Sequence, residues 1–242
     1  MKIITDKKEL LEAIKKDAFA LKYANSRLKY DKEVVLTAVK QYGSVLMYAS
    51  DELKNDKEIA LEAVKQFGLA LDFASEKMKD DKNIVLEAVK QNGYALRFAS
   101  SRLQDDKEVV LTAVKQYGSV LMYASENLKN DKNIVLEAVK QSSPALKYAS
   151  ESLKKDKKVV LEAVKQNAFA LKYANSRLKD DKEVVLEAMK QDGSALKYAS
   201  KRLKDDKEIG VEAVRGGMNM LDQFGTGYLR MFTDYLNCLL KE

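Results

Sequence analysis

An Asp-Lys pair recurs along this chain every 25 residues, with no insertion or deletion between one copy and the next. The pair opens eight full repeats and a ninth that departs from the pattern after Arg215. A sequence repeated at this period indicates a chain of similar structural units, each in contact with the units before and after it. The repeats begin at Asp6, Asp31, Asp56, Asp81, Asp106, Asp131, Asp156, Asp181 and Asp206.

The first half of each repeat has the hydrophobic periodicity of an α-helix. Its apolar residues cover more than half of a helical wheel, which predicts a largely buried helix. The second half has a narrower apolar face, which predicts a second, more exposed helix. In the second repeat the two faces consist of Val34, Val35, Leu36, Ala38 and Val39, and of Val45, Leu46, Tyr48, Ala49 and Leu53.

Capping residues predict where these helices begin and end. The Asp that opens each repeat can accept hydrogen bonds from the free backbone N–H groups of the first turn. Pro144 suits the first turn of a second helix and ends the first helix by about Ser142. The next position holds Ser143 in that repeat, Gly in five repeats, and Ala18 and Ala168 in two. Alanine there indicates that a small residue, rather than a left-handed backbone, is required.

Helices of about ten residues are marginal alone, so each pair must pack on its neighbours. The expected fold is all-α: a right-handed α-solenoid of about eight αα-hairpins over residues 1–215, followed by a C-terminal segment, 216–242. Gly216-Gly217 and Gly225-Thr226-Gly227 are expected to interrupt this segment. The apolar residues 228–240 then form a helix that either caps the last hairpin or docks on a partner or a second copy.

Several classes of function are excluded by composition. The chain has no histidine and one cysteine, Cys238, so Ser-His-Asp and Cys-His catalysis, Cys/His zinc sites and an internal disulfide are ruled out. The recurring Asp residues, doubled at positions such as Asp80-Asp81, are interpreted as helix caps rather than metal ligands. No catalytic, cofactor-binding or metal-binding residues are therefore predicted. Without an apolar leader or a membrane-spanning stretch, we expect a soluble, cytoplasmic protein.

The second halves of the repeats carry the main charge signal. The signal comes from positions 14–24 of the eight full repeats, which are residues 19–29 in the first repeat. Together these positions contain 18 basic and 6 acidic residues, a net charge of +12, whereas the whole chain has +6. This surface has three interpretations: solvated lysines, a site for an acidic protein, and a site for nucleic acid. The candidate partner-binding residues are Lys22, Arg27, Lys29, Tyr94, Arg97, Arg102, Phe169, Lys172, Arg177, Lys179, Lys197, Lys201, Arg202 and Lys204.

Aromatic residues recur at three places in the repeat. Tyr or Phe lies in the middle of the second half of every full repeat, as at Tyr23 and Phe73, which favours core packing over a base-stacking ladder. Where the two halves meet, aromatics vary from repeat to repeat, as at Tyr42 and Phe169. Such residues either form a recognition edge or fill gaps between hairpins. A Lys-Gln pair that precedes the junction, as at Lys40-Gln41, is interpreted as a helix end whose Gln bonds the next hairpin.

Residues Asp106 to Ser125 show the repeat pattern at its clearest, as Asp-Lys-Glu-Val-Val-Leu-x-Ala-Val-Lys-Gln-x-Gly-x-x-Leu-x-Tyr-Ala-Ser. This pattern resembles the domain-of-unknown-function family 4116, from Asp6 to about Arg215. The resemblance implies tandem helical hairpins and implies no reaction. The segment from Gly216 lies outside the pattern.

The sequence therefore predicts a non-enzymatic repeat scaffold that binds another macromolecule. A protein partner, possibly acidic, is the leading hypothesis, with the second halves and the junction aromatics as its contact surface. The alternative is nucleic-acid binding through the basic row of second halves. Neither the identity of the partner nor the oligomeric state is predicted.

Overall fold

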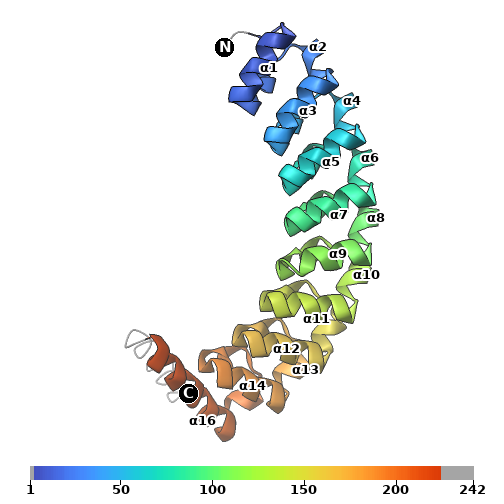
Figure 1. Ribbon diagram of the computed structural model, residues 1–242. Coiled ribbons are helices and arrows are strands. Elements are labelled where there is room, and N and C mark those ends of the chain that lie inside the picture. The colour runs from blue at the N-terminus through green and yellow to red at the C-terminus, as the bar shows by residue number, and fades with distance from the viewer. Residues whose placement is uncertain (1–2, 225–242) are drawn as a thin grey trace. The chain divides into compact units, whose positions relative to one another are not determined.

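The computed structural model describes residues 3–224, and the side chains of residues 3–217. The chain divides into two compact parts, Met1–Leu128 and Lys129–Glu242. Within each part the long helices lie side by side in chain order, with the short helices along one edge (Figure 1). An isolated bridge between Ile4 and Ala24 is the single β feature of the described residues. The prediction of an all-α repeat solenoid is confirmed.

Each repeat contributes three kinds of element: a long α-helix, a six-residue 3₁₀ helix and a short helix. The long helices are α1 (Lys7–Lys16), α3 (Lys32–Gln41), α5 (Lys57–Gln66), α7 (Lys82–Gln91), α9 (Lys107–Val114), α11 (Lys132–Gln141), α12 (Lys157–Gln166), α14 (Lys182–Gln191) and α16 (Lys207–Phe224). The 3₁₀ helices are η1 (Ala18–Tyr23), η2 (Gly43–Tyr48), η3 (Gly68–Phe73), η4 (Gly93–Phe98), η5 (Gly118–Tyr123), η6 (Ser143–Tyr148), η8 (Ala168–Tyr173) and η9 (Gly193–Tyr198). The short helices are α2 (Ser26–Lys29), α4 (Asp51–Lys54), α6 (Glu76–Lys79), α8 (Ser101–Gln104), α10 (Glu126–Lys129), η7 (Leu153–Lys155), α13 (Ser176–Lys179) and α15 (Lys201–Lys204).

The expectation of one ten-residue helix in the second half of each repeat is wrong. That half is a 3₁₀ helix and a short helix, separated by extended backbone. In the second repeat Ala49 has φ −67° and ψ 158°, so η2 ends there. Ser50 then caps α4, its side-chain oxygen accepting a hydrogen bond from the Leu53 N–H at 3.3 Å. An Ala in extended conformation ends each 3₁₀ helix, and the Ser or Asn that follows it caps the short helix. These two residues therefore divide the predicted second helix in two.

The predicted N-caps of the long helices are confirmed. Asp56 Oδ1 accepts from the backbone N–H groups of Glu58 (2.9 Å) and Ile59 (3.1 Å) at the start of α5. Pro144 lies in the first turn of η6, and α11 ends at Gln141 as predicted. The sequence thus places the start of each long helix correctly.

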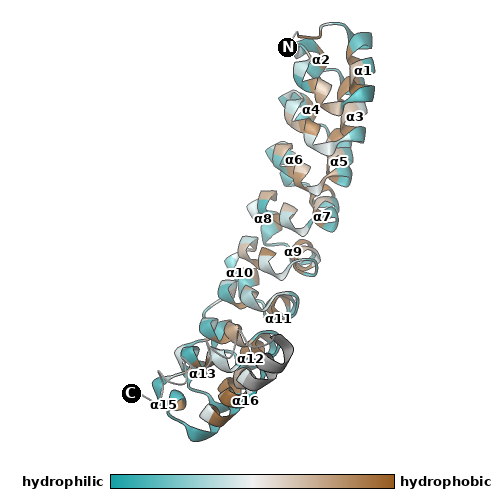
Figure 2. Cartoon of the chain, turned by 90° about the vertical axis from the view of Figure 1, so that its left-hand side faces the viewer, coloured by the Kyte–Doolittle hydropathy of each residue, from teal (hydrophilic) through white to brown (hydrophobic). Residues whose placement is uncertain are grey.

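The core lies between the long helices and the 3₁₀ helices. In the second repeat, Val34, Val35, Ala38 and Val39 of α3 are fully buried, as are Val45 and Leu46 of η2. Leu36 and Tyr48, which the periodicity placed on the apolar faces, are half-buried. Hydrophilic residues predominate on the outer sides of short helices such as α4 and α6 (Figure 2). The apolar faces of successive repeats therefore close over one another within each part.

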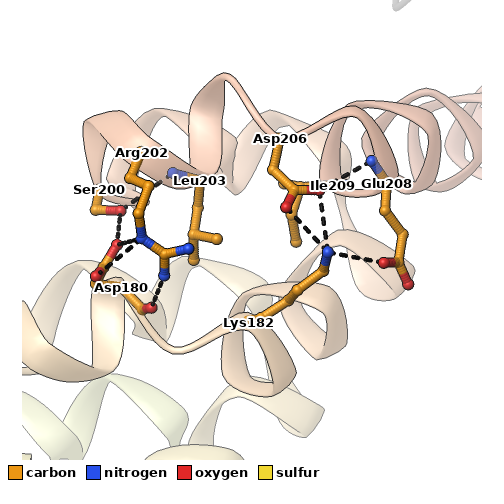
Figure 3. Close-up of polar contacts among 8 residues, drawn as sticks. All are labelled: Asp180, Lys182, Ser200, Arg202, Leu203, Asp206, Glu208 and Ile209. Atoms are coloured by element: carbon orange, nitrogen blue, oxygen red, sulfur yellow. Dashed lines mark hydrogen bonds and ion pairs between the residues drawn. The ribbon is translucent and has the colours of Figure 1, made fainter.

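Within each compact part, ion pairs link one long helix to the next. Lys182 Nζ lies 2.9 Å from Asp206 Oδ2 and 2.8 Å from Glu208 Oε2, while the other oxygen of Asp206 caps α16 (Figure 3). The same arrangement recurs between earlier repeats. It joins Lys7 to Asp31, Lys32 to Asp56, Lys57 to Asp81, Lys82 to Asp106, Lys132 to Asp156 and Lys157 to Asp181.

The short helices are linked by backbone hydrogen bonds. Ser200 N–H donates to the carbonyl oxygen of Lys179 in the preceding repeat at 2.9 Å, and its hydroxyl donates to Asp180. Equivalent backbone bonds run from Ser50 to Lys29 and from Ser75 to Lys54. Within each part, neighbouring repeats are thus linked at two places, at the start of the short helix and at the start of the long helix that follows it (Figure 3).

The small residue that opens each 3₁₀ helix lies against the next long helix. A Cβ added to Gly43 would lie 2.2 Å from the carbonyl oxygen of Ala63, and one added to Gly193 would lie 1.9 Å from that of Ala213. Neither glycine has a positive φ. The small residue is therefore needed for close approach, in agreement with Ala18 and Ala168 at the same position in other repeats.

The expected interruption at Gly216-Gly217 is absent from the structure, because α16 continues through both residues to Phe224. Gly216 stands where earlier repeats have Gln, and a Cβ there would lie 1.8 Å from the carbonyl oxygen of Met189. The glycine thus permits α16 to lie close against α14 rather than ending the helix. The predicted capping helix over 228–240, Gly225-Thr226-Gly227 and Cys238 lie outside the described residues.

Candidate interaction surface

Besides those on the short helices, side chains that differ between repeats gather on and around the 3₁₀ helices. Three positions are involved: the residue just before each 3₁₀ helix, its second residue and its fifth residue. We call this surface the 3₁₀ face. The fifth residue is exposed in all eight 3₁₀ helices and is Lys, Met, Asp or Arg. It is Lys22, Met47, Asp72, Arg97, Met122, Lys147, Lys172 or Lys197.

Aromatic residues on the 3₁₀ face pair across the boundary between repeats. The ring centroids of Phe19 and Tyr42 are 5.2 Å apart, and those of Tyr94 and Tyr117 are 4.9 Å apart. The Tyr94 hydroxyl is also hydrogen-bonded to Ser119 Oγ at 3.0 Å. Tyr42 nevertheless remains 52% exposed and Tyr117 45% exposed. These residues fill the gaps between repeats and still present apolar surface, so the two interpretations of the junction aromatics are compatible.

The two aromatic pairs are separated by three repeats. Phe19 and Tyr94 are 75 residues apart, and so are Tyr42 and Tyr117. The exposed methionines Met47 and Met122 obey the same spacing. The second and fifth repeats therefore share their exposed Tyr and Met, and they also share a buried Val, Val45 or Val120, where the other full repeats have Ala.

Cationic side chains on the 3₁₀ face lie over the aromatic rings that follow them in sequence. Arg97 lies 4.8 Å from the ring centre of Phe98, and Lys172 lies 4.9 Å from that of Tyr173. Lys22 and Lys147 are placed in the same way over Tyr23 and Tyr148. These rings are half-buried, which agrees in part with the predicted core packing of this aromatic position. A cation lies over the part of each ring that the core does not cover.

A hollow opens on the 3₁₀ face of the C-terminal part. Phe169 and Tyr198 meet edge to face with centroids 6.1 Å apart, and Lys197 lies 5.3 Å from the Phe169 ring and 5.1 Å from the Tyr198 ring. The hollow has a volume of about 200 Å³. Its walls include Pro144, Asn167, Phe169, Lys172, Tyr173 and Tyr198. The structure thus brings together three of the predicted partner-binding residues, Phe169, Lys172 and Lys197.

Two other predicted residues are engaged within the protein. Arg202 Nε lies 3.1 Å from Asp180 Oδ1, and its Nη2 donates to the Asp180 carbonyl oxygen at 2.8 Å (Figure 3). Arg102 and Asp80 form the same pair at 3.0 Å. Hydrogen bonds from Ser200 and then from Arg202 lower the pKa of the Asp180 carboxyl below its usual value. These arginines therefore serve as links between repeats and offer less charge to a partner than the sequence suggested.

The remaining basic candidates lie on the short helices. Arg27, Arg177 and Lys201 are exposed there. Lys29, Lys179 and Lys204 are half-buried, and the backbone carbonyl oxygens of Lys29 and Lys179 accept the bonds that join the repeats. The predicted basic row is thus split between two kinds of element, with one group on the 3₁₀ face and the other along the edge of short helices.

Polar links between repeats were the main feature that sequence reasoning missed. The Lys that follows every opening Asp is invariant within the chain, which was a usable signal for a structural role. The Gln of the Lys-Gln pair was expected to bond the next hairpin. Gln116 instead bonds the preceding repeat. Gln116 Nε2 donates to the carbonyl oxygens of Val89 (2.6 Å) and Lys90 (2.9 Å), and its Oε1 accepts from Gly93 N–H.

Comparison with known proteins identifies a family. The model of the family described as Domain of unknown function (DUF4116) matches residues 6–54, 56–104, 106–154, 132–179 and 181–224. No curated protein and no solved structure matches the chain. Among the described residues there is no cluster of His, Cys, Asp and Glu able to hold a metal ion. None of the helices in residues 3–224 is long and apolar enough to cross a membrane.

Proposed function

The chain belongs to the DUF4116 family, and we propose that it is a non-enzymatic scaffold that binds another protein through its 3₁₀ face. The observation that carries this proposal is the contrast between two sets of residues. Those that hold the repeats together, such as the opening Asp and the Lys after it, do not vary along the chain. Those on the 3₁₀ face vary in size, charge and aromaticity from one repeat to the next.

The chemistry of the 3₁₀ face favours a protein partner. Exposed Tyr, Met and Arg are enriched where proteins meet one another, because they supply large contact areas and polar handles. Here Tyr42, Met47, Tyr117 and Met122 are all at least 40% exposed. Tyr94 and Phe169 contribute further aromatic surface beside cations. A surface of this kind can bind side chains of a partner at several repeats in succession.

The basic residues give less support to a nucleic-acid partner. Stacking of bases requires free aromatic faces. The rings of Tyr23, Phe98, Tyr148, Tyr173 and Tyr198, which end their 3₁₀ helices next to the 3₁₀ face, are half-buried, and each has a cation over it. Arg102 and Arg202, which would otherwise contact phosphates, are paired with aspartates. Nucleic-acid binding is accordingly an outcome to be tested rather than the leading proposal.

The test compares proteins captured from a native lysate by the wild-type chain and by a variant of its second aromatic pair, Tyr94→Ser with Tyr117→Ser. We expect a defined set of proteins to bind the wild type and to be lost from the variant. The control is Lys115→Ser, which changes an exposed residue at the end of α9 that is not one of the three positions of the 3₁₀ face. Equal capture by wild type and pair variant, or capture abolished by nuclease, contradicts the proposal. Circular dichroism verifies that all three chains are folded.

A further inference from the structure

Phe169 and Phe19 have different neighbours, although residues 18–29 and 168–179 are identical. The residue before the next 3₁₀ helix is Tyr42 in the case of Phe19, with its ring 5.2 Å from that of Phe19, and Asp192 in the case of Phe169. Asp192 is 7% exposed and accepts a hydrogen bond from Ser194 N–H at 2.8 Å. The hollow beside Phe169 is lined instead by Ser143 and Pro144 of η6 and by Tyr198 of η9.

Three lysines line up with this hollow. Lys147, Lys172 and Lys197 occupy the fifth position of η6, η8 and η9, and all three are exposed. Their ammonium groups lie 5.4, 4.9 and 5.1 Å from the ring centres of Tyr148, Tyr173 and Tyr198. These three 3₁₀ helices contain no acidic residue. The nearest carboxylate along the chain, that of Asp192, is engaged as a cap. The local charge is therefore positive and available to a partner.

The dimensions of the hollow restrict what can occupy it. Its volume of about 200 Å³ is below the roughly 300–1,000 Å³ of sites that enclose a whole small molecule, so it suits one large apolar side chain. Packed helices are about 8–10 Å apart. A peptide in the extended polyproline II conformation advances about 3.1 Å per residue with three residues per turn, so every third side chain lies on the same side. Three residues of such a chain consequently span one repeat.

From these observations we propose that residues 143–198 bind an extended acidic segment of a partner protein. Acidic side chains at about every third position of the segment pair with Lys147, Lys172 and Lys197, and a large apolar side chain between them enters the hollow against Phe169. Charge complementarity selects the carboxylates, and the edge-to-face rings of Phe169 and Tyr198 receive the apolar group. This inference rests on the proposed function and specifies the chemistry of one partner segment.

The probe is a fluorescein-labelled peptide of three Glu-Phe-Ser triplets, measured by fluorescence anisotropy with the full chain. We expect binding that weakens about tenfold when Asp192→Tyr and Lys197→Met are combined, because this variant restores the residues of the second repeat. Lys172→Gln, which removes one charge but keeps a long side chain at the wall of the hollow, should weaken the binding by a smaller factor. The matched control is Lys22→Met in the identical segment of the first repeat, which should leave the affinity unchanged.

Two further probes make the result decisive. A Gln-Phe-Ser peptide removes the carboxylates, and a single-stranded oligothymidylate offers phosphates without them. Absence of binding by the Glu-Phe-Ser peptide, equal affinity for the Gln peptide, or tighter binding of the oligonucleotide overturns the inference. If the acidic peptide fails while the Tyr94–Tyr117 variant still loses its lysate partners, the acidic site is wrong and the scaffold proposal stands. If the wild-type chain captures no lysate protein and does not bind the acidic peptide, the scaffold proposal and the acidic site are both wrong.

Discussion

Lys7 Nζ lies 2.8 Å from a carboxylate oxygen of Asp31 and 2.8 Å from one of Glu33. Asp31 is the N-cap of α3, so one carboxylate both starts a helix and ties it to the helix before it. The same double role belongs to Asp56, Asp81 and Asp156. The invariant Asp-Lys pair is therefore a joint between repeats, and the predictions below depend on that arrangement.

Asp56→Ala should destabilise the protein by about 1–2 kcal/mol, because it removes the cap of α5 as well as the partner of Lys32. Most of the loss is expected from the cap, since Lys32 is largely exposed and its ion pair is screened by solvent. Urea unfolding followed by circular dichroism measures the change. Asp51→Ala is the control: this side chain is fully exposed, and its loss should cost less than about 0.5 kcal/mol. Equal effects of the two substitutions would refute the double role.

Stability should be flat from about pH 5 to 9, because the chain has no histidine. Burial alone would raise the pKa of Asp56, but hydrogen bonds from Lys32, Ile59 and Glu58 outweigh it and hold the pKa below 3.8. The pKa values of Asp31, Asp81, Asp106, Asp156 and Asp181 are lowered by the same balance. A carboxyl with a lowered folded pKa contributes stability above its unfolded pKa and loses it as the pH falls through the folded one. The melting temperature should therefore drop below about pH 4.

The alkaline side follows from the lysines. Hydrogen bonds to Asp56 and then Glu58 raise the pKa of Lys32 above 10.5. A raised folded pKa gives stability that is present below the unfolded pKa and lost as the pH rises through the folded one. Thermal melts should thus show a second decline above about pH 10.5. A continuous slope across pH 5 to 9 would be inconsistent with this set of shifted groups.

Two Gly→Ala substitutions should have opposite signs. Gly43→Ala is expected to cost about 1–3 kcal/mol, because its Cβ would overlap the carbonyl oxygen of Ala63 and the neighbouring backbone must move. Gly210 lies within α16 with nothing within 4 Å of an added Cβ. Gly210→Ala should stabilise by about 0.5–1 kcal/mol through helix propensity. The two melting temperatures measured side by side decide the matter, and a neutral Gly43→Ala would show that the repeats can separate at no cost.

Gln116→Ala should cost about 1 kcal/mol or more, since it leaves Gly93 N–H and the carbonyl oxygen of Val89 without their side-chain partner. Gln66 is at the same position of an earlier repeat, but its amide donates to Glu62 within its own helix at 3.3 Å. Gln66→Ala should therefore change stability by less than about 0.5 kcal/mol. Hydrogen exchange of the Gly93 amide offers a local readout, which should become faster in Gln116→Ala alone.

Much of the fold was predictable because it is local. The N-caps, the length of helices such as α3 and the small residue at Gly43 follow from capping chemistry and periodicity within one repeat. The division of the second half of each repeat into a 3₁₀ helix and a short helix was not predictable, because six residues cannot distinguish a helical period of 3.0 residues from one of 3.6. Contacts between repeats were not predictable either. The partner of Lys7 is 24 residues away, and only the stagger of α1 against α3 brings them together.

The candidate surface was predicted in part, for a similar reason. Charge counting found Lys172 and Lys197, and the variable junction identified Phe169. The sequence did not reveal that Arg102 and Arg202 are held by Asp80 and Asp180, because each pair spans two repeats. Nor did it reveal that Pro144, Phe169 and Tyr198 come together around one hollow, which required the relative placement of neighbouring repeats.

Photo-crosslinking in the native cell shows whether the 3₁₀ face receives a protein partner. A photoreactive amino acid replaces Met122, which is 40% exposed on the 3₁₀ face, or Thr112, which lies on α9 and is not one of the three positions of that face. We predict a discrete crosslinked protein from position 122 and none from position 112. Crosslinking from position 112 alone, or the same proteins from both positions, would contradict this prediction.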